Sequence, residues 1–393
     1  MSRLGKQDSD LLFTFGPYRT RVVFGDEDAR TGSSRRFAVL PSEGAYRPPG
    51  EHPPQGEPSP QGEHPAPERP VAAGNAALVV VDENVRPLYV SGLLPDEPAS
   101  VVSVPAGEAS KSWEQARELL KAALQAGLER DGTIVGVGGG MVCDLAAFCA
   151  SVYMRGCRLI LVPTSLLAMV DASLGGKTAV NLEGIKNLVG TFYPAEEIRI
   201  RIDFLDSLPG REFRSGLAEV IKTALLGDEE LVTLLEVERG RVLSRDRELL
   251  SASVRRCLIA KARVVAEDFR ESGRRAILNL GHTFAHALEA ASGLGVWTHG
   301  EAVAWGMARA ARLGVLLGVT PGAHADRTLG LLAAYGYRFE SDVGIPPERL
   351  VAAMRVDKKR SRGKLRLVLQ RGIGDTIVQA IEESLILQSL ESG

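Results

Sequence analysis

The sequence contains few of the residues that mark a secreted, a disulfide-stabilised or a nucleic-acid-binding protein. Only four of its 393 residues are cysteines, and none of the four belongs to a Cys-x-x-Cys pair. Three lie in apolar stretches, so we expect buried, reduced thiols. The formal net charge of −2 leaves no surplus of basic residues for a nucleic acid.

The chain also contains no uninterrupted apolar run near the roughly 18 residues that a transmembrane helix needs. Its first residues, Met-Ser-Arg-Leu-Gly-Lys-Gln-Asp, carry no apolar segment of the kind found in signal peptides. We therefore expect a cytoplasmic protein. Hydrophobic residues make up 45% and charged residues 24%, which is enough for a large core, and the length favours two or three domains.

A stretch rich in proline, glycine and glutamate occupies residues 43–75, after two short β-like runs at 11–15 and 18–24. It contains a near-repeat, Gly-Glu-His-Pro, around His52 and His64. Such a composition cannot bury apolar surface and predicts a mobile, partly polyproline II loop. Neither histidine has partner ligands nearby in the sequence, so we do not expect a metal site there.

Strands alternate with helices between residue 76 and about residue 206. Apolar runs predict strands at 77–81, 133–137 and 159–162, with helices at 111–130 and 141–154. This alternation is typical of a parallel, Rossmann-like sheet covered by helices. We therefore predict an α/β domain over residues 1–206, with the 43–75 stretch as an insertion.

The remaining chain, residues 207–393, reads as a second and mainly α-helical domain. Helical periodicity predicts helices at 212–226, 229–238, 249–268, 283–291 and 300–317. A weak β signal returns only near 364–369.

A glycine run follows one predicted strand and precedes a helix, at Gly138, Gly139 and Gly140. Glycines let the backbone approach a pyrophosphate, and the helix N-terminus offers free N–H groups to an anion. The spacing is not Gly-x-Gly-x-x-Gly, and a tight structural turn explains it equally well. Asp82 and Asn84 follow another predicted strand. They could bind the hydroxyl groups of a ribose, or they could form a turn that ends the strand.

Cationic residues are candidates for binding an anionic, hydroxylated ligand. Asp171 to Lys177 is glycine-rich and ends in a lysine, and Lys186-Asn187 follows between apolar flanks. Further cations of the same kind are Lys222, Lys261, Arg275, Lys358 and Lys359. Individually, each of these is more often a surface charge, but together they could hold a phosphate and a carboxylate.

Three histidines and one glutamate predict a metal site. His282 and His286 lie four residues apart and share a helix face, His299 begins the next helix, and Glu219 sits in an apolar helix where a carboxylate needs a partner. Two histidines and one carboxylate with open positions are typical of catalytic zinc. Spacing alone favours His282 and His286 as the pair.

Taken in order, these segments resemble the 3-dehydroquinate synthase family of sugar phosphate cyclases over about residues 76–375. The matching motifs include Gly-Gly-Met-Val-Cys-Asp at 139–144, Gly-Leu-Ala-Glu-Val-Ile-Lys at 216–222, Asn-Leu-Gly-His-Thr-Phe-Ala-His at 279–286 and His-Gly-Glu at 299–301. The resemblance implies that 3-deoxy-D-arabino-heptulosonate 7-phosphate is converted to 3-dehydroquinate and phosphate in the shikimate pathway. It also implies a catalytic NAD, a divalent zinc or cobalt ion, and a homodimer.

Site residues follow from the resemblance by position. The implied metal ligands are Glu219, His282 and His299, and His286 becomes a residue for proton transfer or orientation. The implied substrate contacts are Arg155, from the partner subunit, with Asp171, Lys177, Asn187, Lys222, Lys261, Arg275, Asn279 and Lys358. The implied NAD contacts are Asp82, Asn84, Glu108, Lys111, Gly139, Gly140, Met141, Asp144, Thr164, Ser165, Leu167, Lys177 and Lys186.

The chain departs from the family pattern in the 43–75 insertion and in Met141 and Cys143, which replace smaller residues. Neither departure removes a group that the chemistry needs. Three other functions stay open: a sister cyclase acting on an amino-substituted or sedoheptulose-type substrate, a metal-dependent polyol dehydrogenase, and a non-catalytic binding module. Arg275 and Asn279 favour a substrate that carries a carboxylate.

Overall fold

The structure is a computed structural model that describes residues 10–25, 77–93, 100–293, 295–340, 343–357 and 364–391. The proline-rich stretch at 43–75, with His52 and His64, lies outside the described residues, and so does Lys358.

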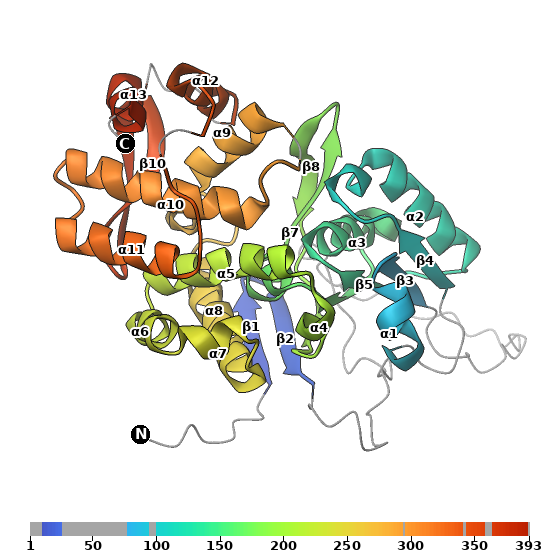
Figure 1. Ribbon diagram of the computed structural model, residues 1–393. Helices are drawn as coiled ribbons and strands as arrows, with labels where there is room; N and C mark the ends of the chain where they lie inside the picture. The colour runs from blue at the N-terminus through green and yellow to red at the C-terminus, as the bar shows by residue number, and fades with distance from the viewer. Residues whose placement is uncertain are drawn as a thin grey trace, which may run out of the picture.

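A seven-stranded sheet forms the first half of the protein, in the order β1-β2-β9-β6-β5-β3-β4 (Figure 1). Only the edge pair β1–β2 is antiparallel, and the other neighbours run parallel. The strands are β1 (Leu11–Phe15), β2 (Tyr18–Phe24), β3 (Ala77–Asp82), β4 (Ser100–Val104), β5 (Thr133–Gly138), β6 (Arg158–Pro163) and β9 (Glu197–Ile200). The predicted parallel sheet is confirmed.

Helices cover this sheet, as its apolar strands require. The four residues Leu78–Val81 of β3 are all buried, which is typical of a parallel strand covered on both faces. The covering helices are α1 (Arg86–Leu93), α2 (Trp113–Gln125) and α3 (Gly140–Val152). Helix α2 begins later than predicted because the Ser112 side chain caps it, accepting from the backbone N–H of Gln115. It also ends earlier, at Gln125, just before Gly127, whose φ is +65°.

The sequence reading missed a hairpin made of β7 (Lys177–Leu182) and β8 (Ile185–Phe192), where it expected only a glycine-rich segment. The two turn residues, Glu183 and Gly184, both have positive φ, at 50° and 77°. Positive φ at both positions is what a two-residue hairpin turn of the primed type needs. The Glu-Gly pair between alternating residues was therefore the available signal.

The second half is mainly helical, as predicted. Its helices are α4 (Phe204–Ser207), α5 (Gly210–Leu225), α6 (Glu229–Val237), α7 (Arg239–Leu243), α8 (Arg247–Glu267), α9 (His282–Ser292), α10 (His299–Leu316), α11 (Gly322–Ala334), α12 (Pro347–Asp357) and α13 (Glu383–Glu391). The weak β signal corresponds to β10 (Lys364–Gly372), which pairs with β11 (Asp375–Glu382) in an antiparallel hairpin that was not predicted.

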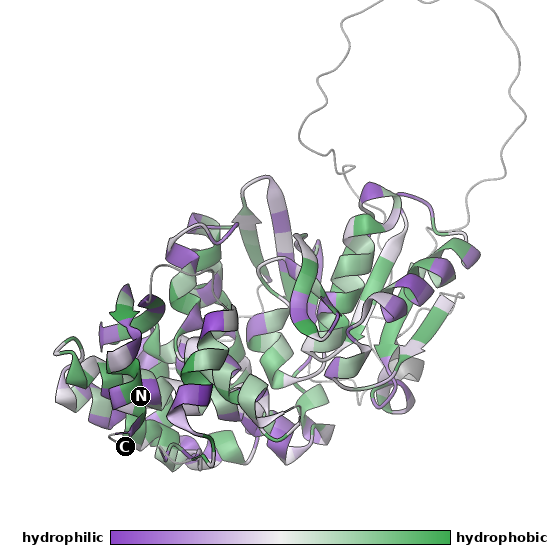
Figure 2. Ribbon diagram, turned by 90° about the horizontal axis from the view of Figure 1, so that it is seen from above, coloured by the Kyte–Doolittle hydropathy of each residue, from purple (hydrophilic) through white to green (hydrophobic). Residues whose placement is uncertain are grey.

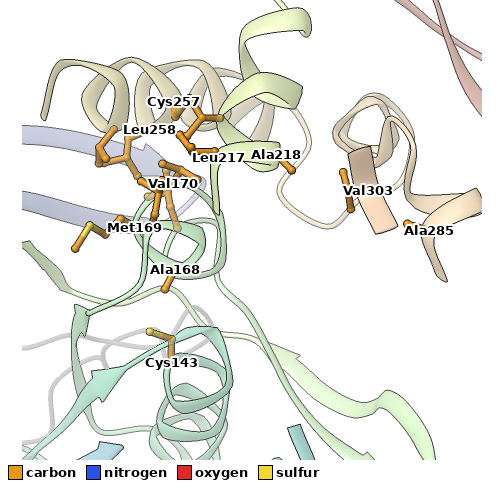
Figure 3. Packing of buried hydrophobic residues seen from close by; sticks show 14 of the residues in the cluster. Cys143, Ala168, Met169, Val170, Leu217, Ala218, Cys257, Leu258, Ala285 and Val303 are labelled. Atoms are coloured by element: carbon orange, nitrogen blue, oxygen red, sulfur yellow. The ribbon is translucent and has the colours of Figure 1, made fainter. Parts of the chain in front are cut away.

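The hydrophobic core runs from the sheet into the helical half through a short π-helix, η4 (Ala168–Ala172). Figure 3 shows Val170 of this segment beside Leu217 of α5 and Leu258 of α8. Hydrophobic and hydrophilic residues alternate along the helices of both halves (Figure 2), as expected where one helix face packs inward.

All four cysteines are buried and unpaired, as expected. Among the described residues, none of the helices has both the length and the hydropathy that a membrane span requires.

Candidate active site

Two glycines of α10 bring three helices together at the predicted metal site. A Cβ on Gly300 would lie 2.0 Å from the backbone oxygen of Ser215 in α5, and one on Gly306 would lie 2.1 Å from the backbone oxygen of Gly281, just before α9. Only glycine permits such close approach. The ends of α5, α9 and α10 therefore converge, although they are far apart in the sequence.

Glu219, His282 and His299 meet at this convergence. The Nε2 atom of His299 lies 3.5 Å from Oε1 of Glu219, and Nε2 of His282 lies 3.7 Å from the same oxygen. The possible ligand atoms of the three residues all lie within 4.8 Å of one another. His286 is adjacent, with its ring centroid 5.6 Å from that of His282. The structure therefore favours His299 over His286 as the partner of His282.

The environment of Glu219 fits a bound cation. Its side chain is completely buried, and neither carboxylate oxygen makes a well-formed hydrogen bond among the described residues. A buried carboxylate needs compensation, and here Lys222 supplies an ion pair one helical turn away. Burial opposes ionisation, but Lys222, His299 and His282 lower the pKa of Glu219 to about 2. A divalent ion would add the missing ligand contacts.

The two histidines differ in charge state. Burial, followed by the nearby Lys222 charge, lowers the pKa of His282 to about 3, so this ring is neutral and can donate a lone pair. Burial also acts on His299, but the adjacent carboxylates of Glu219 and Glu289 outweigh it and raise its pKa to about 10. The two carboxylates around His299 therefore make this pocket strongly attractive to a positive charge.

A second ion pair, Lys261 with Asp171, lies next to the metal set. Lys261 Nζ donates to Asp171 Oδ1 at 2.5 Å and to the backbone oxygen of Asp171 at 2.6 Å. Burial disfavours the charge on Asp171, but Lys261 and Lys222 hold its pKa well below the usual range. Burial lowers the pKa of Lys261. This pair joins η4, in the segment after β6, to α8 of the helical half.

The predicted substrate residues Arg275, Asn279 and Lys177 form a third group. The buried Arg275 guanidinium donates to the backbone oxygens of Phe269, at 2.6 Å, and Gly175, at 2.9 Å. Glu271, which the sequence reading missed, pairs with Lys177 and accepts from Asn279 Nδ2 at 3.0 Å. Glu271 lies in a loop, where residues have no regular spacing, so no signal in the sequence marked it. Its contacts in the structure identify it.

The strand order of the sheet reverses at β3, the kind of position at which dinucleotides bind. From β3 the chain moves outward to β4, then returns to the other side of β3 to build β5 and β6. Ligands of parallel sheets bind where the strand order reverses in this way. Gly139 follows β5 as the N-cap of α3, and a Cβ there would be 3.5 Å from Ser165 Oγ, after β6. The glycine run and Thr164-Ser165 therefore face one edge of the sheet.

A buried lysine connects the predicted cofactor residues. Lys111 Nζ lies 2.5 Å from Asp144 Oδ2 and 2.5 Å from Asn187 Oδ1. Glu108 accepts from Asn181 Nδ2 at 2.9 Å, and the backbone N–H of Asn187 donates to Asn181 Oδ1. Asn181 was not predicted. These bonds fasten the β7–β8 hairpin to α3 and to the 3-10 helix η2 (Glu108–Ser110).

The remaining predicted residues take simpler positions. Asp82 Oδ1 accepts from the backbone N–H of Asn84 at 2.9 Å, so these two residues form the strand-ending turn that was the alternative interpretation. Met141 lies in the first turn of α3, and a Cβ on Gly140 would be 3.5 Å from Leu167 Cδ2. Arg155 is exposed at the end of the 3-10 helix η3 (Tyr153–Arg155), with a positive φ of 66°.

One further carboxylate, Glu289, was missed although the sequence held a signal for it. It lies three residues after His286 on α9 and therefore on the same helix face. Its Oε1 lies 3.5 Å from Lys186 Nζ, and its Oε2 lies 3.7 Å from His299 Nδ1.

Two family models match this chain in sequence. Residues 101–215 match the model described as 3-dehydroquinate synthase N-terminal, and residues 216–360 match 3-dehydroquinate synthase C-terminal. A 3-dehydroquinate synthase of Acidithiobacillus ferrooxidans is 44% identical over 329 residues, covering 82% of this chain and 90% of the relative. The enzyme of the same name from Xanthomonas oryzae pv. oryzae is 42% identical, covering 81% and 89%.

Solved structures show the same architecture. A 2-epi-5-epi-valiolone synthase from Streptomyces hygroscopicus subsp. jinggangensis, solved with NAD+ and Zn2+ bound, matches with a TM-score of 0.74 at 30% identity, covering 81% of this chain and 91% of that one. A 2-deoxy-scyllo-inosose synthase matches with a TM-score of 0.77 at 23% identity, covering 98% and 100%, which shows the fold alone. A glycerol dehydrogenase from Schizosaccharomyces pombe matches more distantly, with a TM-score of 0.55 at 18% identity, covering 81% and 82%.

Proposed function

The chain belongs to the 3-dehydroquinate synthase family, and from this premise we propose which of its residues carry the reaction. Its function is the conversion of 3-deoxy-D-arabino-heptulosonate 7-phosphate to 3-dehydroquinate and phosphate, in the shikimate pathway of aromatic amino acid biosynthesis. It is a carbon–oxygen lyase that uses NAD and a divalent metal. Residues 1–206 would bind NAD, and residues 207–393 the metal and much of the substrate.

The fully buried Glu219 facing His282 and His299 is the observation that carries the proposal. These three side chains would hold the metal, and Lys222 balances the charge of Glu219 at its other carboxylate oxygen. When bound, zinc or cobalt polarises the substrate alcohol that is to be oxidised and supports the later aldol step. The buried position keeps water away and strengthens every charge interaction in the pocket.

The cations around this centre bind and orient the substrate. Lys222 and Lys261 reach it from α5 and α8, and Arg275 approaches from the 3-10 helix η5 (Arg274–Asn279). Lys177 and Asn279 share Glu271, so a substrate anion competes with this carboxylate for them. Two anionic groups on the substrate, a carboxylate and a phosphate, match such a surplus of positive groups. Asn187 and Lys358 complete the proposed substrate set.

The cofactor residues lie at the ends of β3, β5 and β6. Gly139 and Gly140 would let the pyrophosphate approach the N-terminus of α3. Asp82 and Asn84, which form the turn after β3, would bind the adenosine ribose. With NAD bound, the site has a hydride acceptor that is regenerated within one turnover. Asp144, which Lys111 holds in place, would lie toward the nicotinamide end of the cofactor.

Proton transfer is assigned to His286 and to the substrate itself. His286 stands beside both histidine ligands, with its ring centroid 6.2 Å from that of His299, and acts in proton transfer or orientation. The departing phosphate takes the proton in the elimination. This fits a pocket with many cations and few free bases.

The functional unit is a cytoplasmic homodimer in this proposal. Arg155 is exposed on a 3-10 helix whose residues Met154 and Arg155 both have positive φ. Such strained backbone is usually held for a purpose. Arg155 would enter the active site of the partner subunit, next to the substrate phosphate.

The deciding experiment incubates the purified protein with the heptulosonate phosphate, NAD and zinc, and measures phosphate release. We expect one phosphate per 3-dehydroquinate formed, with no net accumulation of NADH. Failure to release phosphate with either zinc or cobalt would reject the proposal. Steady accumulation of NADH on a simple polyol would favour a polyol dehydrogenase instead.

A sister cyclase is the second candidate, because the 2-epi-5-epi-valiolone synthase structure is 30% identical to this chain. Arg275 and Asn279 would favour a substrate with a carboxylate, because a guanidinium and a side-chain amide can both donate hydrogen bonds to one. In this structure, their donors are taken by the backbone oxygens of Phe269 and Gly175 and by Glu271. A side-by-side assay with sedoheptulose 7-phosphate and with an amino-substituted analogue discriminates the candidates. Faster turnover of either compound than of the heptulosonate would favour the sister cyclase.

A further inference from the structure

We propose that Glu289 is a positioning residue that orients His299 toward the metal and links this ligand to Lys186 of the β7–β8 hairpin. The inference rests on the proposed function, because it takes Glu219, His282 and His299 as the ligand set. It gives a role to Glu289, a carboxylate beside the ligand set, and to its contact with Lys186, which joins the helical half to the residues assigned to NAD.

The two ring nitrogens of His299 face two different carboxylates. Nε2 lies 3.5 Å from Glu219 Oε1, on the side of the ligand set, and Nδ1 lies 3.7 Å from Glu289 Oε2. An imidazole that binds a metal through one nitrogen usually donates the N–H of the other to a carboxylate or carbonyl. A shift of about 1 Å makes the second contact a hydrogen bond. Glu289 would then fix the tautomer that presents Nε2 to the metal.

His282 already has an equivalent partner. Its Nδ1 lies 3.2 Å from the backbone oxygen of Leu280, while its Nε2 faces Glu219. Both histidines therefore show the same arrangement, in which Nε2 points to the shared carboxylate and Nδ1 meets an outer acceptor. Glu289 thus serves as the outer acceptor for Nδ1 of His299, as the backbone oxygen of Leu280 does for Nδ1 of His282.

Lys186 holds Glu289 from the opposite side. Its Nζ lies 3.5 Å from Glu289 Oε1, and Lys186 belongs to β8, whereas Glu289 belongs to α9. The side chain of Glu289 is 15% exposed and that of Lys186 is 42% exposed, so the carboxylate is shielded from solvent while the lysine reaches it from the surface. Since Lys186 is assigned to the NAD pocket, Glu289 connects a cofactor residue with a metal ligand.

A competing interpretation treats Glu289 as a ligand itself, since His286, Glu289 and His299 also lie within 4.8 Å of one another. Geometry and burial argue against it. Each carboxylate is paired with a lysine, but Nε2 of His282 and Nε2 of His299 both face the fully buried Glu219. Glu289 faces the other ring nitrogen of His299, Nδ1, and its side chain is 15% exposed, so it is the better outer acceptor.

Metal affinity, rather than turnover, tests the proposal. Cobalt and zinc would be titrated into the metal-free full-length protein in competition with a chromophoric chelator, and the visible spectrum of the cobalt form would be recorded. We expect Glu289→Gln to weaken binding about 10- to 100-fold, the usual effect of losing an outer carboxylate. Glu289→Asp should recover part of this loss. The matched control is Glu236→Gln, which removes a carboxylate of α6 that is paired with Arg327 of α11. It should leave metal affinity unchanged.

Two results would overturn the positioning role. One is a Glu289→Gln protein that binds cobalt within twofold of the wild type and with the same spectrum. The other is a loss of binding as complete as that in Glu219→Gln, which would make Glu289 a ligand. Retained affinity in Glu219→Gln is a separate outcome that would reject the ligand set of the proposed function.

The link to Lys186 is tested by a double-mutant cycle. If Lys186 acts on the metal through Glu289, Lys186→Met should weaken metal binding in the wild-type background and have little effect in Glu289→Gln. Equal effects of Lys186→Met in the two backgrounds would contradict the link.

Discussion

Lys261 and Asp171 join the two halves of the protein at the base of the active site. The ammonium group lies 2.5 Å from the carboxylate and 2.6 Å from the backbone oxygen of the same residue. Asp171 belongs to the π-helix η4, and π-helical turns occur frequently at functional sites. One lysine therefore fixes both the backbone and the side chain of a segment that lies beside Glu219.

Lys261→Met should cost stability as well as activity. The substitution keeps an unbranched side chain but leaves Asp171 without its nearest cation, so the free energy of unfolding should fall by on the order of 3 kcal/mol. Urea unfolding measures this change. The double variant Asp171→Asn/Lys261→Met removes both charges and should regain much of the stability without regaining turnover. A double variant no more stable than Lys261→Met would show that the charge pair is not the cause.

Glu219→Gln should abolish metal binding and lower turnover by on the order of 10³ or more. Glutamine keeps the shape of the side chain but removes the charge that attracts the cation. NAD affinity should survive, because the cofactor residues lie at the ends of the strands. Zinc at 100 times its dissociation constant should stabilise the wild type by about 2.7 kcal/mol, and a chelator should reverse this. A similar stabilisation of the variant would remove Glu219 from the ligand set.

Two adjacent glycines should respond in opposite ways to alanine. A Cβ on Gly138 would lie 2.7 Å from Val142 Cβ, so Gly138→Ala should destabilise the fold by about 1–3 kcal/mol. A Cβ on Gly139 would meet only Ser165 Oγ at 3.5 Å, an ordinary contact, so Gly139→Ala should fold normally.

The same Gly139→Ala variant should bind NAD at least about tenfold more weakly, because the methyl group intrudes where the pyrophosphate meets the backbone. Equilibrium binding of NAD and thermal melting of both variants test the contrast. Unchanged NAD affinity in Gly139→Ala would move the pyrophosphate away from this turn.

Arg155→Ala tests the partner contribution by complementation. Alone, the variant should dimerise but turn over slowly. If Arg155 acts in the active site of the partner subunit, a dimer of one Arg155→Ala subunit and one Glu219→Gln subunit contains one complete site. Unfolding and refolding an equal mixture should then restore activity to about a quarter of the wild-type level. A mixture no more active than its components would place Arg155 in its own subunit's site or outside the site.

Glu236→Gln should reveal a pH-dependent surface ion pair. Hydrogen bonding to Arg327 lowers the pKa of Glu236 below its ordinary value of 4.5, so the ionised form stabilises the folded protein. The stabilisation is present above that value and is lost as the pH falls through the folded-state pKa.

At pH 7, we expect Glu236→Gln to be less stable than the wild type by about 0.5 kcal/mol, because the pair is partly exposed. Urea unfolding of both proteins should show the difference shrinking below pH 4.5. A difference that stays constant in acid would contradict the ion-pair explanation.

Local patterns in the sequence predicted most of the strands and helices around the site, and they indicated a metal-binding group of residues. Continuous apolar runs predicted β3, β5 and β6, and 3.6-residue periodicity predicted α5, α9 and α10, because both signals arise within one element. The motifs around Glu219, His282 and His299 indicated a metal site from the sequence alone. The β7–β8 hairpin was missed because its short turn was read as part of a glycine-rich segment.

Only the tertiary structure decided which groups meet. Spacing favoured His282 with His286, and the family resemblance implied His299. The close approach of α10 to α5 and α9 at Gly300 and Gly306 brings His299 to Glu219. Glu271 became visible only through its contact with Lys177, and the contacts of Glu289 with Lys186 and His299 give a role to a residue whose spacing alone showed only a shared helix face. The sequence thus determines which chemical groups are available and which helix or strand carries them. Distances between groups on separate elements depend on packing, so they follow from the fold as a whole.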